Sequence, residues 1–111
     1  MSESYNFSKI LKNLNILYIE DEKNIRLNIK KTLELFCENV LDAENILNAK
    51  EILTTSRIDI IISDINLPDM SGIDFVKEIR ISDKTIPIIL LSAYTASAVV
   101  FPPKPAGPIP N

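Results

Sequence analysis

The stretch Ile58-Asp-Ile-Ile-Ile-Ser-Asp64-Ile-Asn-Leu-Pro68-Asp-Met-Ser-Gly72 carries most of the information about the fold. A run of β-branched apolar residues ends at Asp64, and a proline and a Ser-Gly pair that can begin a helix follow it. A short, continuous apolar run is typical of a strand buried on both faces of a parallel sheet. The stretch therefore predicts a buried strand that delivers one carboxylate, Asp64, to the edge of a sheet.

Further strand and helix patterns alternate along the chain before and after this stretch. Strands are predicted at about 15–20, 39–43 and 86–91, and helices at about 22–37, 45–56 and from 71 onward. In the last helix, Ser71 is the expected N-cap, and Ile73, Val76 and Ile79 form the expected buried stripe. The alternation predicts an α/β fold, a doubly wound parallel sheet with right-handed crossovers and helices on both faces.

The ends of the chain differ in composition from this regular part. Residues 1–13 are a polar lead-in, and one folded domain is predicted over 14–95. Residues 96–111 hold five of the seven prolines. Proline at this density blocks helices and sheet ladders, so an irregular, Pro-rich tail is expected there.

Composition excludes several classes of function. The chain of 111 residues has a net charge of −3 and no histidine, which excludes Ser-His-Asp catalysis and His-ligated zinc. The absence of a basic patch argues against direct binding to nucleic acid. A single cysteine, Cys37, fits a reducing compartment and a role as a small core residue. No signal-peptide pattern and no membrane-length apolar run occurs, so a cytoplasmic location without membrane contact is expected.

Polar side chains follow three of the predicted strands. Glu20 and Asp21 end the first strand, Asp64 ends the third, and Ser92 ends the fourth. In such sheets the active crevice lies at the carboxyl ends of the strands. Carboxylate oxygens suit Mg²⁺, and a carboxylate is also a known phosphoryl acceptor. The pattern predicts a magnesium site that works on a phosphoryl group at Asp64.

Simpler interpretations exist for some of these residues. Asp21 alone fits the N-cap of the following helix, and Ser92 alone fits a turn. Other acids are interpreted as solvated or capping residues: Asp59, Asp69, Asp74 and Asp83.

Residues 14–95 resemble the receiver domain of bacterial two-component response regulators. The matching segments are Ile16-Leu-Tyr-Ile-Glu20-Asp21-Glu22, Asp59-Ile-Ile-Ile-Ser-Asp64-Ile-Asn-Leu-Pro-Asp-Met-Ser-Gly72 and Ile86-Pro-Ile-Ile-Leu-Leu-Ser92-Ala93. The resemblance implies the CheY-like, flavodoxin-like strand order 2-1-3-4-5.

The same resemblance implies a role for each site residue. Asp64 would accept a phosphoryl group from a sensor histidine kinase. Asp21, Asp64 and the backbone carbonyl of Asn66 would hold Mg²⁺, with Glu20 assisting through water in place of the more usual aspartate. Ser92 would be the switch hydroxyl. Such a domain is not an enzyme in the usual sense, although it assists its own phosphorylation.

The resemblance breaks after Ser92. A receiver continues with a fourth helix, a fifth strand and a fifth helix, and these are expected to be missing, because a parallel crossover needs about a dozen residues. Strand 86–91 is then an exposed edge, and two copies are expected to pair through it or to exchange residues 96–111. Lys104 matches the family's lysine in type but not in spacing, so its role stays open.

Two other functions compete with the phosphoacceptor. One is a pseudo-receiver that binds a partner without switching, which the uncertain lysine favours and the intact acids oppose. The other is a haloacid-dehalogenase-like phosphatase, which requires a second aspartate at the position of Asn66.

Overall fold

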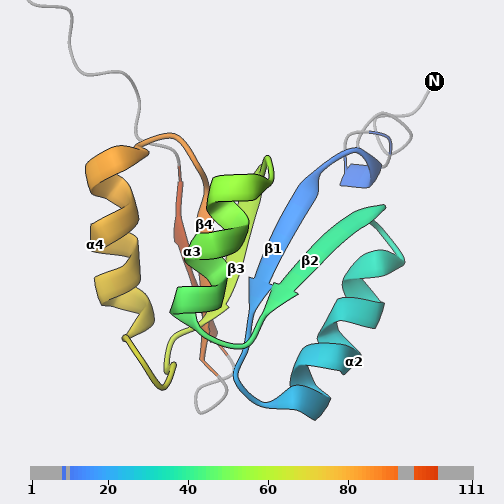
Figure 1. The fold of residues 1–111 in the computed structure, drawn as a ribbon. Helices are drawn as coiled ribbons and strands as arrows, with labels where there is room; N and C mark the ends of the chain where they lie inside the picture. The colour runs from blue at the N-terminus through green and yellow to red at the C-terminus, as the bar shows by residue number, and fades with distance from the viewer. Residues whose placement is uncertain (1–8, 10, 93–96, 103–111) are drawn as a thin grey trace, which may run out of the picture.

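The structure is a computed structural model that describes residues 9, 11–92 and 97–102. Within them lies a five-stranded sheet in the order β2-β1-β3-β4-β5 (Figure 1). The strands are β1 (Asn15–Ile19), β2 (Asn39–Ala43), β3 (Ile60–Asp64), β4 (Ile88–Ser92) and β5 (Ser97–Phe101). The helices labelled in the figure are α2 (Lys23–Glu34), α3 (Ile46–Thr55) and α4 (Gly72–Ser82).

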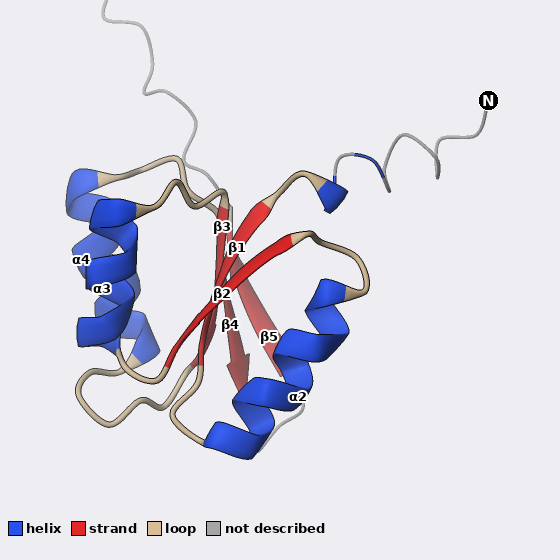
Figure 2. Ribbon diagram, turned by 45° about the vertical axis from the view of Figure 1, so that its right-hand side comes forward, coloured by secondary structure: helices blue, strands red, loops and turns tan. Residues whose placement is uncertain are grey.

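The first four strands run parallel, as their alternation with helices predicts. Helices α3 and α4 cover one face of the sheet and α2 covers the other (Figure 2). β3 lies at the centre of the sheet, between β1 and β4, and its Ile61 and Ser63 are fully buried. The predicted doubly wound α/β fold and the strand order 2-1-3-4-5 are confirmed.

β5 differs from the prediction. It pairs antiparallel with β4, from Ser92 opposite Ser97 to Ile88 opposite Phe101. Only residues 93–96 separate the two strands in the sequence, which is too few for a parallel crossover and enough for an antiparallel connection. The fifth position of the sheet is therefore filled by a strand of the opposite direction.

Two predictions about the end of the chain need correction. The prediction that residues 96–111 are irregular is wrong for Ser97–Phe101, because residues that favour strands stand there and the prolines begin only at Pro102. The prediction that strand 86–91 is an edge through which two copies pair is also wrong, because β5 occupies that edge. Residues 103–111 lie outside the described part of the chain.

The main hydrophobic core lies between the sheet and helices α3 and α4. From α4, Phe75 is fully buried, Val76 is buried and Ile79 packs against the cluster. The periodicity also predicts Ile73 in this stripe, but its side chain is 46% exposed. The predicted stripe is wrong there because α4 begins at Gly72 and turns Phe75, rather than Ile73, toward the sheet.

The core on the α2 side of the sheet is smaller. No residue of α2 is fully buried, and the cluster on this face consists of Ile16, Cys37 and Val40, with Leu33 packed against it. Cys37 is a buried free thiol, as predicted, and burial raises its pKa. The helix therefore covers only part of its face of the sheet.

Polar side chains cap the helices that begin at the carboxyl edge of the sheet. Ser71 is the N-cap of α4, and its hydroxyl accepts a hydrogen bond of 3.1 Å from the amide of Asp74. Asp69 accepts hydrogen bonds of 3.1 Å from the amides of both Ile46 and Leu47 at the start of α3. The predicted N-cap role of Ser71 is confirmed. Asp69, interpreted from the sequence as solvated or capping, joins the loop after β3 to a helix more than twenty residues away in the sequence.

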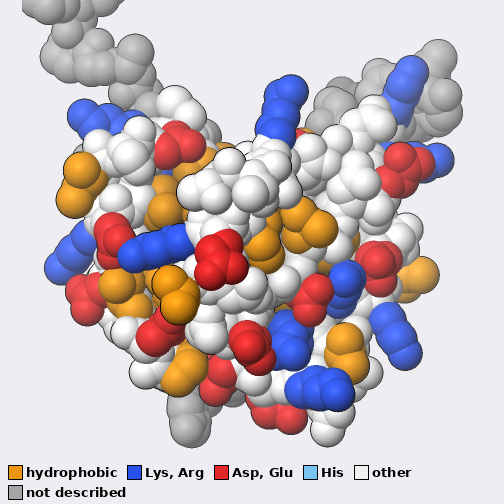
Figure 3. Space-filling view, in the orientation of Figure 1, with side chains coloured by type: hydrophobic (Ala, Val, Ile, Leu, Met, Phe, Trp, Pro, Cys, Tyr) orange, Lys and Arg blue, Asp and Glu red, His pale blue; other side chains and the backbone are white. Residues whose placement is uncertain are grey.

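The surface shows no broad patch of one charge on the face seen in Figure 3, where basic and acidic side chains are interspersed. Within the described ranges, no helix is both long enough and apolar enough to cross a membrane.

Candidate functional site

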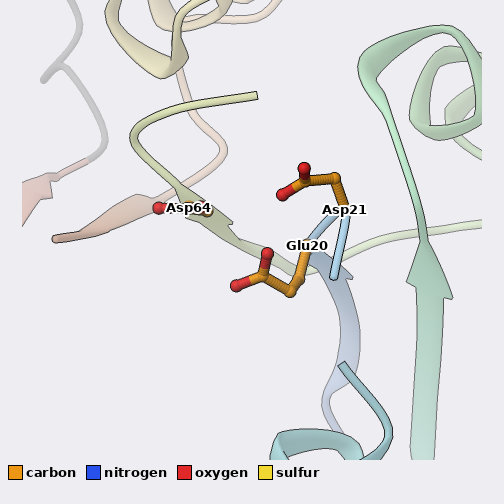
Figure 4. A group of neighbouring side chains, drawn as sticks. All are labelled: Glu20, Asp21 and Asp64. Atoms are coloured by element: carbon orange, nitrogen blue, oxygen red, sulfur yellow. The ribbon is translucent and has the colours of Figure 1, made fainter. Parts of the chain in front are cut away.

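Three carboxylates meet at the carboxyl edge of the sheet. Glu20 and Asp21 stand on the chain that leaves β1, and Asp64 ends β3 (Figure 4). One carboxylate oxygen from each residue lies within 4.8 Å of those of the other two. Glu20 is buried, Asp64 is half-buried and Asp21 is exposed. The structure thus brings together the three acids that the sequence predicts.

The register between β1 and β3 explains why these acids meet. Ile19 pairs with Ser63, so the next residue of each strand, Glu20 and Asp64, lies at the same level of the sheet. The amide of Glu20 also donates to the carbonyl of Ala43 at the end of β2, at 3.0 Å. Parallel pairing with two neighbours therefore fixes the backbone of Glu20 in the sheet.

The electrostatics of the cluster favour a cation. Burial raises the pKa of Glu20, the neighbouring carboxylates of Asp21 and Asp64 raise it further, and a hydrogen bond from the amide of Glu22 opposes the shift. Burial, followed by the charges of Glu20 and Asp64, also raises the pKa of Tyr18, so its phenol keeps its proton. A divalent cation would relieve the repulsion among these carboxylates.

The loop after Asp64 is tightly closed. The amide of Asn66 lies 3.4 Å from a carboxylate oxygen of Asp64, and the amide of Gly72 donates to the carbonyl of Ile65 at 2.8 Å. A Cβ on Gly72 would lie 3.0 Å from Leu90 and 3.1 Å from the carbonyl oxygen of Asp64. Glycine therefore permits the start of α4 to approach the backbone that carries Asp64.

Ser92 shares a cavity with Glu20 and Asp64. The cavity measures about 320 Å³, and its lining includes Glu20, Asp64, Ser92 and the apolar side chains of Ile25 and Leu91. No lysine or arginine of the described residues lines it. The structure thus places the predicted hydroxyl beside the predicted acceptor, in a cavity whose charged groups are all acidic.

The predicted site residue Lys104 lies outside the described residues. The strand that precedes it runs away from the acids, because Ser97 pairs with Ser92 and Phe101 lies roughly 14 Å further along β5. Arg80 of α4 donates to the carbonyls of Phe101 at 3.2 Å and Pro102 at 3.3 Å, which holds the end of β5 at the opposite edge. A role for Lys104 at the site stays a prediction.

The N-cap of α2 is a different residue from the one that the sequence suggests. Glu22, not Asp21, is the N-cap of α2, and its carboxylate accepts from the amides of Asn24 at 3.3 Å and Ile25 at 2.7 Å. Asp21 is therefore not used as the N-cap of the helix that follows it.

One residue that contacts the backbone of the acidic cluster was not predicted from the sequence. The guanidinium of Arg26 donates to the backbone carbonyl oxygen of Glu20 at 2.8 Å. Periodicity places Arg26 on the polar side of α2, and no local pattern indicates that its side chain turns back toward the acids. The sequence offers only its position, one turn after the acidic triplet.

Taken together, the doubly wound sheet carries three clustered acids and a hydroxyl at its carboxyl edge, the edge at which such sheets bind ligands. The sequence model of the response regulator receiver domain family matches residues 16–102. The chain belongs to this family, the receiver domains of two-component systems. This membership favours a receiver domain over the haloacid-dehalogenase-like phosphatase.

Curated relatives agree with the assignment. The chain is 37% identical over 79 residues to the KDP operon transcriptional regulatory protein KdpE of Escherichia coli, and this match covers 71% of this chain and 35% of that protein. It is 36% identical over 98 residues to the chemotaxis protein CheY1 of Helicobacter pylori, covering 85% of this chain and 79% of that protein. The chain thus spans about a third of the first relative and most of the second.

Solved structures show the same fold. The response regulator TrrA of Thermotoga maritima, in complex with Mg²⁺ and BeF, has a TM-score of 0.68 and 37% identity, and the match covers 75% of this chain and 72% of that one. A response regulator receiver domain protein of Clostridium thermocellum has a TM-score of 0.67 and 34% identity, over 72% of this chain and 65% of that one.

Proposed function

We propose that this chain is a Mg²⁺-dependent phosphoacceptor module of a two-component system, in which Asp64 takes a phosphoryl group from a sensor histidine kinase. The observation that carries the proposal is the meeting of Glu20, Asp21 and Asp64 within 4.8 Å of one another, beside the cavity that Ser92 also lines. The solved relative in complex with Mg²⁺ and BeF supports the same chemistry.

The donor set fits magnesium. Asp21, Asp64 and the backbone carbonyl of Asn66 are the proposed ligands, and Glu20 acts through a water molecule. All are hard oxygen donors, and exposed Asp21 leaves room for the waters that Mg²⁺ retains. When bound, the ion supplies positive charge that offsets the charge of the transferring phosphoryl group.

Asp64 is the proposed nucleophile in the transfer. One of its carboxylate oxygens attacks phosphorus, and a new O–P bond forms while the N–P bond to the kinase histidine breaks. The electron pair of the broken bond stays on the imidazole nitrogen, and the product is an aspartyl phosphate. The hydroxyl of Ser92 donates a hydrogen bond to an oxygen of the new phosphoryl group.

Two parts of the proposal concern partners. The phosphoryl donor is a sensor histidine kinase, in keeping with the membership of the receiver family. Exchange of residues 96–111 between two copies stays a prediction, although Ser97–Phe101 pairs with β4 of its own chain. Size-exclusion chromatography with light scattering measures the oligomeric state, and a single species with the monomer mass would contradict the exchange.

The test of the phosphoacceptor is intact-mass spectrometry after incubation with acetyl phosphate and Mg²⁺. The parent protein should gain one phosphoryl group, Asp64→Asn should gain none, and Asp74→Asn, which removes an exposed acid outside the cluster, should behave as the parent. Excess EDTA in the incubation should prevent the adduct from forming. An adduct on Asp64→Asn would show that another residue is the acceptor.

A second function, a receiver-shaped module that binds a partner without switching, has two observations in its favour. No described lysine or arginine lines the cavity beside Asp64, and β5 leads the chain away from it. A folded parent protein that binds Mg²⁺ but gains no phosphoryl group would favour this second function.

A further inference from the structure

Arg26 connects the acidic loop to the neighbouring strand. One guanidinium nitrogen, Nη1, donates to the backbone carbonyl oxygens of Glu20 at 2.8 Å and Asp21 at 3.4 Å. The Nε of the same side chain donates to a carboxylate oxygen of Asp42 in β2 at 3.1 Å. The side chain is only 13% exposed. A single, largely buried side chain therefore bonds to the backbone of the two consecutive acidic residues of the site.

Asp42 in turn fixes the guanidinium. Its second carboxylate oxygen accepts from Nζ of Lys30, one turn further along α2, at 2.9 Å. Asp42 also pairs in register with Tyr18 of β1, so its backbone belongs to the sheet rather than to a loop. Both oxygens of the carboxylate are engaged, and the rigid fork of Arg26 bridges Asp42 to the backbone of Glu20 and Asp21.

We propose that Arg26 is a positioning residue for the divalent cation, because it sets the orientation of the loop that carries Glu20 and Asp21. This inference rests on the proposed function. Each peptide unit is planar, so a hydrogen bond to a carbonyl restrains the orientation of that peptide and of the residues that flank it. Two restrained carbonyls in succession therefore limit the directions in which the carboxylates of Glu20 and Asp21 point.

The charge of Arg26 has the opposite effect on metal binding. A cation near the site repels Mg²⁺, so removing the charge alone would tighten binding, whereas removing the restraint would weaken it. Asp42 neutralises much of that charge at 3.1 Å, and salt screens what remains. Loss of an outer group that orients metal ligands typically weakens metal binding about 10–100-fold. We therefore expect the positioning effect to dominate.

Three full-length variants separate the two effects. Arg26→Gln removes both charge and fork, and Arg26→Lys keeps the charge but cannot bridge Asp42 and the two carbonyls together. Lys30→Gln is the matched control, because it also removes a cation bound to Asp42 and does not contact the loop. Calorimetric titration with Mg²⁺ gives the dissociation constant, and melting in EDTA gives the stability without metal.

Both Arg26 variants should bind Mg²⁺ about tenfold more weakly than the parent, and Lys30→Gln should differ from it less than about threefold. The difference should persist in 0.5 M NaCl, in which charge effects are screened. Parent-like or tighter binding by Arg26→Gln, or equal weakening by Lys30→Gln, would overturn the inference. If Arg26→Gln does not fold, Arg26→Lys carries the test alone.

The outcome for the parent protein distinguishes this inference from the proposed function. A folded parent that shows no Mg²⁺ binding would defeat the proposed function itself. A parent that binds Mg²⁺ and gains a phosphoryl group, beside Arg26 variants that bind equally well, would overturn only the role of Arg26.

Discussion

Glutamine in place of Glu20 removes one negative charge from three that meet within 4.8 Å. Glu20 is buried, and its carboxylate accepts a hydrogen bond from the amide of Glu22 at 3.1 Å. Glutamine has the same shape, and its amide oxygen can accept the same bond, so the substitution changes the charge with little change in packing. We expect Glu20→Gln to stabilise the metal-free protein at neutral pH.

The size of the effect follows from the separation of the charges. At the 4.8 Å limit within which the carboxylate oxygens lie, two unit charges repel each other by about 0.9 kcal/mol in water, and by about 3.5 kcal/mol at an effective dielectric constant near 20. Because Asp21 is exposed and Asp64 is half-buried, the lower figure applies better. Glu20 faces two such charges, so the expected gain is about 1.7 kcal/mol, or a rise of roughly 7–14 °C in Tm for a domain of this size.

The gain should depend on pH. Burial first, and the neighbouring carboxylates with it, raise the pKa of Glu20 above its ordinary value of 4.5. The folded state therefore binds more protons than the unfolded state, and the parent protein gains stability relative to the variant as the pH falls through the folded pKa. The difference between the two proteins should be largest at neutral pH and should vanish below about pH 4.

Urea denaturation followed by far-ultraviolet circular dichroism, in EDTA and in excess Mg²⁺, measures both effects. Mg²⁺ should raise the stability of the parent more than that of Glu20→Gln. Ligand binding stabilises the folded state by an amount that grows with affinity, and the variant lacks one of the three negative charges that attract the ion. Glu51→Gln, which removes an exposed charge from the middle of α3, is the control and should change little. A variant less stable than the parent in EDTA at pH 7, or a pH-independent difference, would refute the electrostatic argument.

Three further changes test other parts of the structure. Phe75→Ala empties a fully buried position in the main core and should cost about 3–5 kcal/mol, measured as a lower urea midpoint; an unchanged midpoint would contradict the described core. Gly72→Ala places a methyl group 3.1 Å from the carbonyl oxygen of Asp64 and should cost about 1 kcal/mol and slow formation of the phosphoryl adduct, timed by mass spectrometry. Although burial opposes it, the amides of Ile46 and Leu47 hold the pKa of Asp69 below its ordinary value. That carboxylate therefore contributes stability above the ordinary pKa, which is lost as the pH falls through the lower folded pKa; acid denaturation curves of Asp69→Asn should lack this loss.

Local patterns were sufficient to predict most of the fold. The apolar run that ends at Asp64 became the central strand, since a strand that is covered on both faces is apolar at most of its positions. Ser71 was predictable as an N-cap because a helix start leaves amides that a nearby side chain must satisfy. Glu20, Asp21 and Asp64 were predictable as neighbours because the carboxyl ends of parallel strands meet at one edge.

Contacts that depend on a distant partner were not predictable in this way. Asp69 caps α3 across more than twenty residues of sequence, and Arg26 reaches both Asp42 and the carbonyl of Glu20. In each case the residue type permits many partners, and the tertiary arrangement selects one. Burial of Phe75 in place of Ile73 has the same origin, since the start of α4 decides which of its residues turn toward the sheet.

The direction of β5 links the end of the fold to the chemistry of the site. Only four residues join β4 to β5, so the chain must turn back and run antiparallel, and its next residues begin at the edge opposite the acids. Anything that residues after Phe101 bring to Asp64 must first travel back along the length of the sheet. Ser92 and the acids that precede it are in place without that return. If a variant that lacks residues 103–111 still gains a phosphoryl group, as the parent protein is expected to do, these earlier residues are sufficient for the acceptor chemistry.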